Sequence, residues 1–177
     1  MGGTVGKVNY YGFYQYKRSD GYRPNSSLDQ HTAYLSATIN VSEKFSIRPE
    51  YTHTNYLAQQ PGGLTDAQFE MDPRQSNRTR NWFAVDWNLF ALKFQYQVTE
   101  KIRVNSQFFG LIGGRDAIGN LGNINQIDFL ENRDFLRDDF KNWGNETRLF
   151  WQYTTFDQPS TLLVLSLIHI SEPTRPY

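Results

Sequence analysis

Residues 31–54 read HTAYLSATINVSEKFSIRPEYTHT, and this stretch decides the fold. From residue 33 to residue 41 the odd positions carry Ala, Leu, Ile or Val, while the even positions carry Tyr, Ser, Thr or Asn. A period of two is typical of a β-strand with one apolar face. Three residues, Ser42, Glu43 and Lys44, separate this run from a second alternating run that begins at Phe45. The stretch therefore predicts an antiparallel hairpin with a short turn. Placing Val41 opposite Phe45 brings apolar residues together across the ladder.

The same pattern recurs along the chain. Residues 94–98 lead through Thr99-Glu100-Lys101, a near copy of the first turn, into an apolar-alternating run at 102–104. A third pair spans residues 143–155 and 161–164, with a turn at 157–160, and an opening strand covers residues 8–16. Upstream of Phe90 the apolar residues occupy odd positions and downstream they occupy even ones, which predicts a bulge there. We expect about seven strands.

The connections between these strands are of two kinds that alternate. Short turns lie at 42–44, 99–101 and 157–160, and long polar loops lie at 19–29, 57–79 and 112–142. A helix is one interpretation of the acidic stretch 125–140 in the last loop. Consecutive connections of an antiparallel meander fall at opposite ends of the sheet. Short turns at one end and long loops at the other are the signature of an outer-membrane β-barrel.

Composition agrees with this class. The 177 residues contain 18 Lys and Arg against 18 Asp and Glu, so net charge gives no reason to expect a nucleic-acid partner. The chain has no Cys, which excludes disulfides and thiol chemistry, and no apolar run long enough for a spanning helix. Aromatic residues reach 16% in a chain of mean hydropathy −0.64. Interfacial girdles explain this excess, and their candidates are Tyr10, Tyr14, Tyr16, Tyr51, Trp87, Trp151 and Tyr153.

A soluble β-sandwich, such as a carbohydrate-binding module, is the alternative, because its strands also alternate. The two architectures place one set of apolar side chains differently. A sandwich buries them between two sheets, whereas a barrel displays them on the convex face of one sheet. The set is Ile39, Ile47, Val85, Phe94, Val104 and Trp151.

Four stretches resemble the TonB-dependent outer-membrane receptors, within them the ferric-dicitrate-like and siderophore-like group. They are residues 20–26 (DGYRPNS), 81–88 (NWFAVDWN), 114–121 (GRDAIGNL) and 141–146 (KNWGNE). The resemblance implies a barrel of about 22 strands that encloses a plug. It also implies import of ferric citrate or siderophores, driven by the TonB energy-coupling complex, with outer-membrane lipid around the barrel. The signal peptide, plug and coupling box of that family are not recognisable here. Bacterial barrels have an even number of strands, at least about eight, so seven cannot close. The chain is therefore interpreted as an internal fragment.

The end of the chain breaks from this pattern. Residues from 166 on (SLIHISEPTRPY) resemble a translated sequencing adaptor. We therefore expect a partial barrel over residues 1–165 and a poorly packed, non-native tail over 166–177. An apolar final strand with a Pro-rich tail is the alternative.

Catalytic chemistry is sparse, so neither an enzyme nor a cofactor is expected. The sequence has no Gly-x-Ser-x-Gly elbow. His31 and His53 share one face of the first hairpin, but no third metal ligand is evident. A calcium site is less favoured than a solvated acidic face for the acidic residues of the last loop, which are Glu131, Asp134, Asp138 and Asp139.

Cationic residues form the candidate ligand site. Strand parity directs four cations to the lumen near the long loops: Lys17, Arg78, Arg80 and Arg115. Arg78 and Arg80 face inward if Phe83 and Val85 face lipid. Arg115 does so if Ile102 and Val104 face lipid, and Lys17 does so if Val8 and Tyr10 face lipid. Arg forks suit carboxylate-rich anions such as ferric chelates. The alternative is that these cations pair with loop acids such as Asp20, Asp72 and Asp116.

Overall fold

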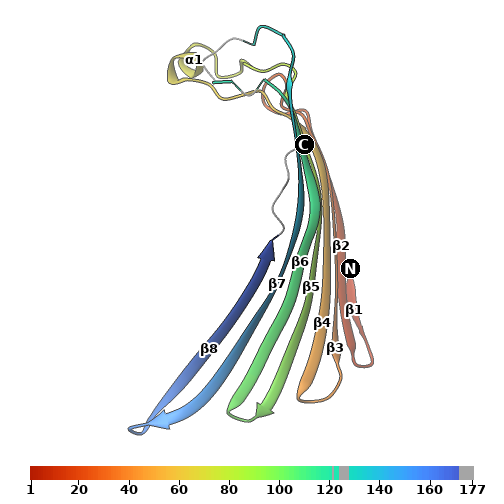
Figure 1. The fold of residues 1–177 in the computed structure, drawn as a ribbon. Helices are drawn as coiled ribbons and strands as arrows, with labels where there is room; N and C mark the ends of the chain where they lie inside the picture. The colour runs from red at the N-terminus through yellow and green to blue at the C-terminus, as the bar shows by residue number, and fades with distance from the viewer. Residues whose placement is uncertain (121, 124–127, 172–177) are drawn as a thin grey trace.

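The computed structural model describes residues 1–120, 122–123 and 128–171. These residues form a single antiparallel sheet in which each strand pairs with the next along the chain (Figure 1). Its strands are β1 (Gly2–Val5), β2 (Val8–Ser19), β3 (Leu28–Asn40), β4 (Phe45–Gln59), β5 (Trp82–Thr99), β6 (Ile102–Gly119), β7 (Asp134–Thr155) and β8 (Gln158–Ser171). The predicted meander is confirmed, with eight strands instead of seven. No second sheet stacks on it within the described residues, so the sandwich alternative is wrong.

The first hairpin has the register that alternation predicts. Ile39 lies opposite Ile47, and the turn closes with the N–H of Ser42 donating to the carbonyl of Phe45 at 3.1 Å. The last turn differs from its predicted position. Phe156 and Asp157 have φ of 50° and 57°, which makes a two-residue hairpin turn, so Gln158 already belongs to β8.

Alternation gives the sheet two faces. Paired residues point to the same side, so each row of partners across the ladder belongs to one face. We call one the apolar face; it carries Ile39, Ile47, Phe94, Val104 and Trp151. We call the other the polar face; it carries Thr38, Arg48, Lys93, Gln107 and Glu146. Five of the six residues predicted to share a face do so.

Val85 is the exception, because β5 contains no bulge near Phe90. The β4–β5 ladder runs without interruption from Phe45 opposite Tyr96 to Gln59 opposite Trp82. Val85 therefore lies on the polar face, where it is only 5% exposed.

The same correction applies to one of the seven girdle candidates. Trp87 also lies on the polar face, where its ring is 6.5 Å from that of Phe140. The other six candidates lie on the apolar face.

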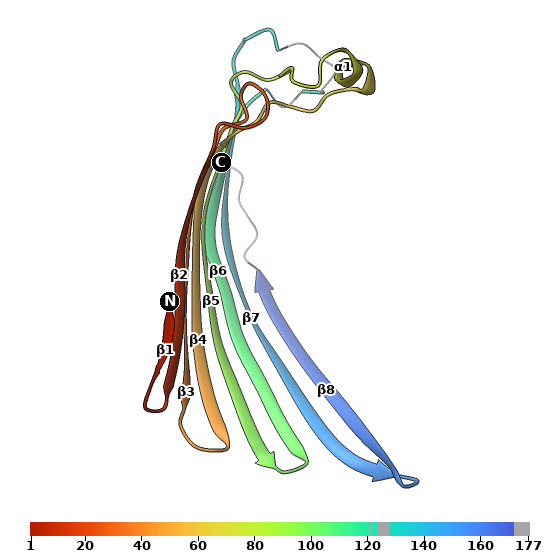
Figure 2. The same ribbon diagram turned by 180° about the vertical axis from the view of Figure 1, so that it is seen from behind.

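The long connections lie at one end of the sheet and the short turns at the other (Figures 1 and 2). The long connections cover 20–27, 60–81 and 120–133, so the strands extend further than predicted. Residues 134–140 of the acidic stretch are strand and not helix, and 125–127 lie outside the described residues. The second loop contains α1 (Asp66–Met71), which begins with a capping box between Thr65 and Gln68. None of the helical segments described is long and apolar enough to cross a bilayer.

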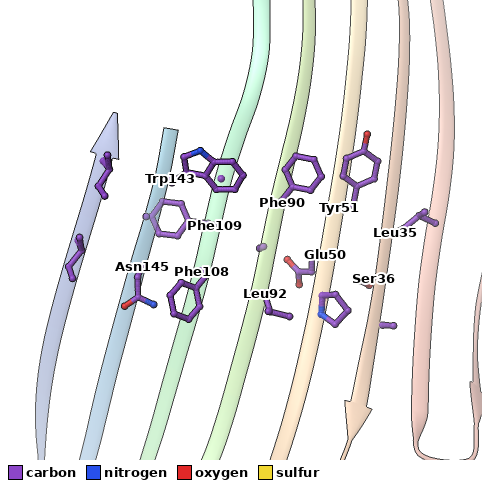
Figure 3. Close-up of a pocket in the computed structure, with 17 residues that line it drawn as sticks. Leu35, Ser36, Glu50, Tyr51, Phe90, Leu92, Phe108, Phe109, Trp143 and Asn145 are labelled. Carbon is purple, nitrogen blue, oxygen red and sulfur yellow. The ribbon is translucent and has the colours of Figure 1, made fainter. Parts of the chain in front are cut away.

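Large rings lie over glycines where β6 meets β7. A Cβ on Gly110 would come within 2.3 Å of the Trp143 ring, and one on Gly144 within 2.4 Å of the Phe109 ring. Figure 3 labels both rings, and the pairing places them on opposite faces of the sheet. On the apolar face, Trp143 also borders a shallow hollow of about 800 Å³ that Leu35, Tyr51 and Phe90 help to line.

β8 extends through residues that were expected to pack poorly. Pairing continues from Thr147 opposite Ser166 to Asn142 opposite Ser171, so the strand extends past residue 165, while residues 172–177 lie outside the described part. That the tail is non-native stays a prediction. This pairing gives the adaptor interpretation no support. β8 does differ from its neighbour near the turn, because Leu165 and Leu167 lie on the polar face opposite Arg148 and Glu146.

The adaptor interpretation makes a direct prediction about the gene. We expect genomic DNA, sequenced from an adaptor-free amplicon, to lack the codons for residues 166–177. Finding these codons in frame would show that β8 is native to its end.

Candidate ligand-binding mouth

The three long loops are fastened to each other by side chains that bind backbone carbonyl groups. Asn25 has φ of 56°, in the left-handed region that Asn tolerates. Its Nδ2 donates to the carbonyls of Gln60, Arg78 and Asn81 at 3.0, 2.7 and 3.3 Å. One amide of the first loop thus holds both ends of the second.

Arg78 joins the second loop to the third. Its side chain lies under the loops, with the residue only 2% exposed. The guanidinium donates to the carbonyls of Asn120, Gly122 and Asn123 at 3.2, 3.1 and 2.8 Å. These bonds orient carbonyl dipoles toward a buried positive charge, which charge-assisted hydrogen bonding favours.

Asn81 makes a second connection to the same segment. Its Nδ2 donates to the carbonyl of Asn120 at 2.9 Å, and its Oδ1 accepts from the N–H of Asn120 at 2.9 Å. Gly119 permits this approach, since it has φ of 155° and any Cβ there would lie 2.1 Å from Asn81 Oδ1.

Arg80 makes an ion pair with the third loop. Its Nη2 lies 3.4 Å from Asp128 Oδ1 and donates to the carbonyl of Glu131 at 3.1 Å. The N–H of Leu130 donates to the Asp128 carboxylate and lowers its pKa, and Asn120 and Arg80 lower it further. A carboxyl with a lowered pKa stabilises the loop contact above its ordinary pKa, and this contribution is lost as pH falls through the lowered value.

Lys17 and Arg115 lie on the sheet instead of in the loops. They share one row of the polar face with Gln30, Tyr56 and Val85 between them. Four strand spacings separate β2 from β6, about 19 Å. Lys17 is exposed and makes no hydrogen bond or ion pair with the described part of the chain.

Arg115 is paired with an acid of the next strand. Its Nε lies 2.8 Å from Asp138 Oδ2, and its guanidinium lies 5.7 Å from the centre of the Phe140 ring. The exposed guanidinium edge faces the same side of the sheet as Lys17.

The four predicted cations therefore fall into two groups. Arg78 and Arg80 lie in the loop cluster, and Lys17 and Arg115 lie on the polar face below it. Loop-acid pairing was the alternative considered from sequence. Acids do pair with Arg80 and Arg115, but they are Asp128 and Asp138. Asp116, one of the loop acids named in that alternative, pairs with Arg137 on the apolar face.

Aromatic side chains on the polar face near the loops were missed from sequence. Tyr56 and Phe83 have ring centres 5.8 Å apart, and Trp87 and Phe140 lie nearby on the same face. The bulge predicted near Phe90 would place Phe83 on the apolar face, and β5 has no bulge there. These aromatic residues can be identified once the odd-numbered positions of β5 are assigned to the polar face.

The two histidines have ordinary polar partners. His31 Nε2 lies 3.1 Å from Asp29 Oδ1, and His53 Nδ1 lies 3.1 Å from Asn88 Oδ1. Among the described residues, no group of three or more His, Asp or Glu side chains is placed to hold a metal ion.

The role of Arg78 as a fastener can be tested by substitution. Arg78→Ala in the full-length protein should weaken loop packing by about 1–3 kcal/mol, because buried carbonyls lose their donors. The measurement is the rate of proteolytic cleavage within 60–81. Arg74→Ala in the same loop is the control, since Arg74 is exposed and lies over the Tyr22 ring. Equal cleavage rates in both variants would contradict the assignment.

Comparison with known proteins supports the architecture. No family model and no curated protein matches the sequence. Among solved structures, the ferric citrate transporter FecA in its unliganded form superposes with a TM-score of 0.80 at 18% identity. The match covers 99% of this chain and 27% of that transporter, so the chain spans about a quarter of its length. The neighbour is a transporter and not an enzyme, which agrees with the sequence-based expectation. At this identity the likeness concerns fold alone: the chain has the fold of part of a β-barrel wall.

Proposed function

We propose that the chain is part of an outer-membrane active transporter that imports ferric chelates, iron dicitrate or a siderophore, with energy from the TonB system. One observation carries the proposal. A single sheet has an apolar band on one face, while its polar face leads to a mouth that carries cations. The likeness to FecA adds support.

The apolar band has the height of a bilayer core. On β6 the apolar face carries Ile102, Val104, Phe108 and Ile112 before it becomes polar at Asp116. The ten steps from Ile102 to Ile112 span roughly 33 Å along the strand, or about 25 Å along the membrane normal at a barrel tilt near 40°. The outward apolar band of outer-membrane barrels has about this height.

Tyr and Trp side chains lie on both sides of the middle of this band. Tyr96 and Trp151 lie toward the short turns, and Tyr51 and Trp143 lie toward the long loops. Tyr and Trp are enriched at membrane interfaces because each ring has an apolar body and a polar group.

Polar groups inside the band satisfy each other. The Ser106 and Thr147 hydroxyls are 2.8 Å apart, and Asn145 Nδ2 donates to Ser106 Oγ at 3.2 Å. Hydrocarbon offers no partners, so internal pairing is what a lipid-facing position requires.

The mouth supplies positive charge to an incoming anion. In the proposal Lys17 and Arg115 contact the chelate, while Arg78 and Arg80 hold the loops around it. Positive potential at an entrance raises the local anion concentration, and added salt weakens the effect. Energy coupling would use a plug and coupling box in the full-length protein.

Membrane insertion is tested by a pair of adjacent residues on opposite faces. Leu92 lies on the apolar face near mid-band and Ala91 lies on the polar face. We expect Leu92→Arg to destabilise the folded full-length protein in lipid by about 2–4 kcal/mol, with a small effect of Ala91→Arg. Heat-modifiable mobility and urea unfolding in vesicles measure this. Equal effects of both substitutions would contradict membrane insertion.

Ligand capture is tested on the purified full-length protein. Arg115→Ala should weaken binding of ferric citrate or a siderophore by about 1–3 kcal/mol, as loss of a charge-assisted hydrogen bond does, and Lys17→Ala should act in the same direction. Arg137→Ala is the control, because Arg137 lies on the opposite face. Uptake of radioactive iron should also disappear in cells that lack TonB. Unchanged affinity in the Lys17 and Arg115 double variant would remove these cations from the site.

A further inference from the structure

A second group of charged side chains lies on the polar face near the short turns. Two rows of paired residues cross the sheet there: Arg48, Lys93, Gln107 and Glu146 form one, and Ser46, Gln95, Asn105 and Arg148 form the other. They line a hollow of about 350 Å³, which we call the turn-end pocket. Ten residues of β6 separate Asn105 from Arg115, roughly 33 Å along the strand. The turn-end pocket is therefore separate from the mouth.

One carboxylate holds two cations in the pocket wall. Glu50 lies 2.8 Å from both Arg48 Nε and Lys93 Nζ. The Glu50 side chain is 14% exposed, whereas those of Arg48 and Lys93 are 46% and 42% exposed. The negative charge thus lies beneath the cations, and the accessible surface presents positive groups.

Arg148 is held in the same way on the other side of the pocket. Its Nε lies 2.8 Å from Glu146 Oε1, with side-chain exposures of 48% and 19% respectively. Both Nη groups of Arg148 are without a partner among the described residues. The ion pair with Glu146 is made at Nε, which leaves the Nη edge of the planar guanidinium for a second acceptor.

An unpaired acceptor lies between these cations. Asn105 Oδ1 is buried and has no hydrogen-bond partner in the described structure. Asn105 is the direct ladder partner of both Gln95 and Arg148. A buried amide oxygen without a donor is costly, so a ligand hydroxyl placed there would be favoured.

We propose that the turn-end pocket binds a small oxyanion that carries carboxylate or phosphate groups together with a hydroxyl. Arg48, Lys93 and Arg148 would bind the anionic oxygens, and Asn105 would accept from the hydroxyl. Three cations oppose two carboxylates in the pocket, so an incoming anion meets an excess of positive charge. Anion binding in the turn-end pocket is independent of the mouth and of the transport of iron.

Calorimetric titration of the purified full-length protein with iron-free citrate and, separately, with inorganic phosphate tests the proposal. We expect saturable binding of at least one anion, and the two titrations show which chemistry the pocket prefers. Arg148→Gln should weaken this binding about tenfold. Arg148→Lys should restore part of the affinity, because lysine supplies the positive charge but not the planar guanidinium with its paired donors. Arg103→Gln is the matched control, since Arg103 lies on the same face over the Phe150 ring but does not line the pocket.

The outcomes separate this site from the mouth. Lys17→Ala and Arg115→Ala should leave anion binding at the turn-end pocket unchanged, whatever they do to ferric chelates. The proposal is overturned if the wild-type protein binds neither anion saturably, or if Arg148→Gln and Arg103→Gln have equal effects. Heat-modifiable mobility of each variant establishes that it is folded.

Discussion

The register of the backbone ladder from β2 to β7 is the constraint on which the rest of the structure depends, and its one shift, between Gln97 and Thr99, lies at the turn end of β5. Side chains alternate with a period of two, so each strand's register decides the face on which every one of its residues lies. A shift of β5 by one residue would place Leu92 among the polar groups and Lys93 in the apolar band. The ladder therefore also determines which cations share a face. Lys17 and Arg115 lie in the same row because each of the four strand pairs between β2 and β6 has the register observed.

The hairpins were predictable because their turns and alternation agree. Ser42, Glu43 and Lys44 leave one register that pairs Ile39 with Ile47, and the structure has that pairing. β5 was not predictable in the same way, since Phe83 and Val85 on one face and Phe90 and Phe94 on the other are all apolar. Alternation cannot assign a face where aromatic residues also line the polar side. The β4 partners resolve it, and they are a tertiary property.

The candidate mouth was only partly predictable for a related reason. Parity within β2 and β6 placed Lys17 and Arg115 on the polar face, as the structure does. Arg78 and Arg80 were assigned by extending parity beyond the end of β5, where the chain no longer alternates. Their partners are carbonyls of the third loop and Asp128. Any residue type presents a backbone carbonyl, so sequence contains no pattern that would reveal the role of Arg78.

The rings that lie over glycines at the β6–β7 junction bear on how this sheet assembles. Short turns set the register of the hairpins they close, but a connection as long as 120–133 leaves many registers open to its two strands. Trp143 needs Gly110 opposite it and Phe109 needs Gly144, on opposite faces of the same pair of strands. A slip of one residue would press each ring against a neighbour that has a side chain. Incorrect alignments of this pair are therefore excluded by steric overlap, so its long connection is free to vary in length and sequence without loss of alignment.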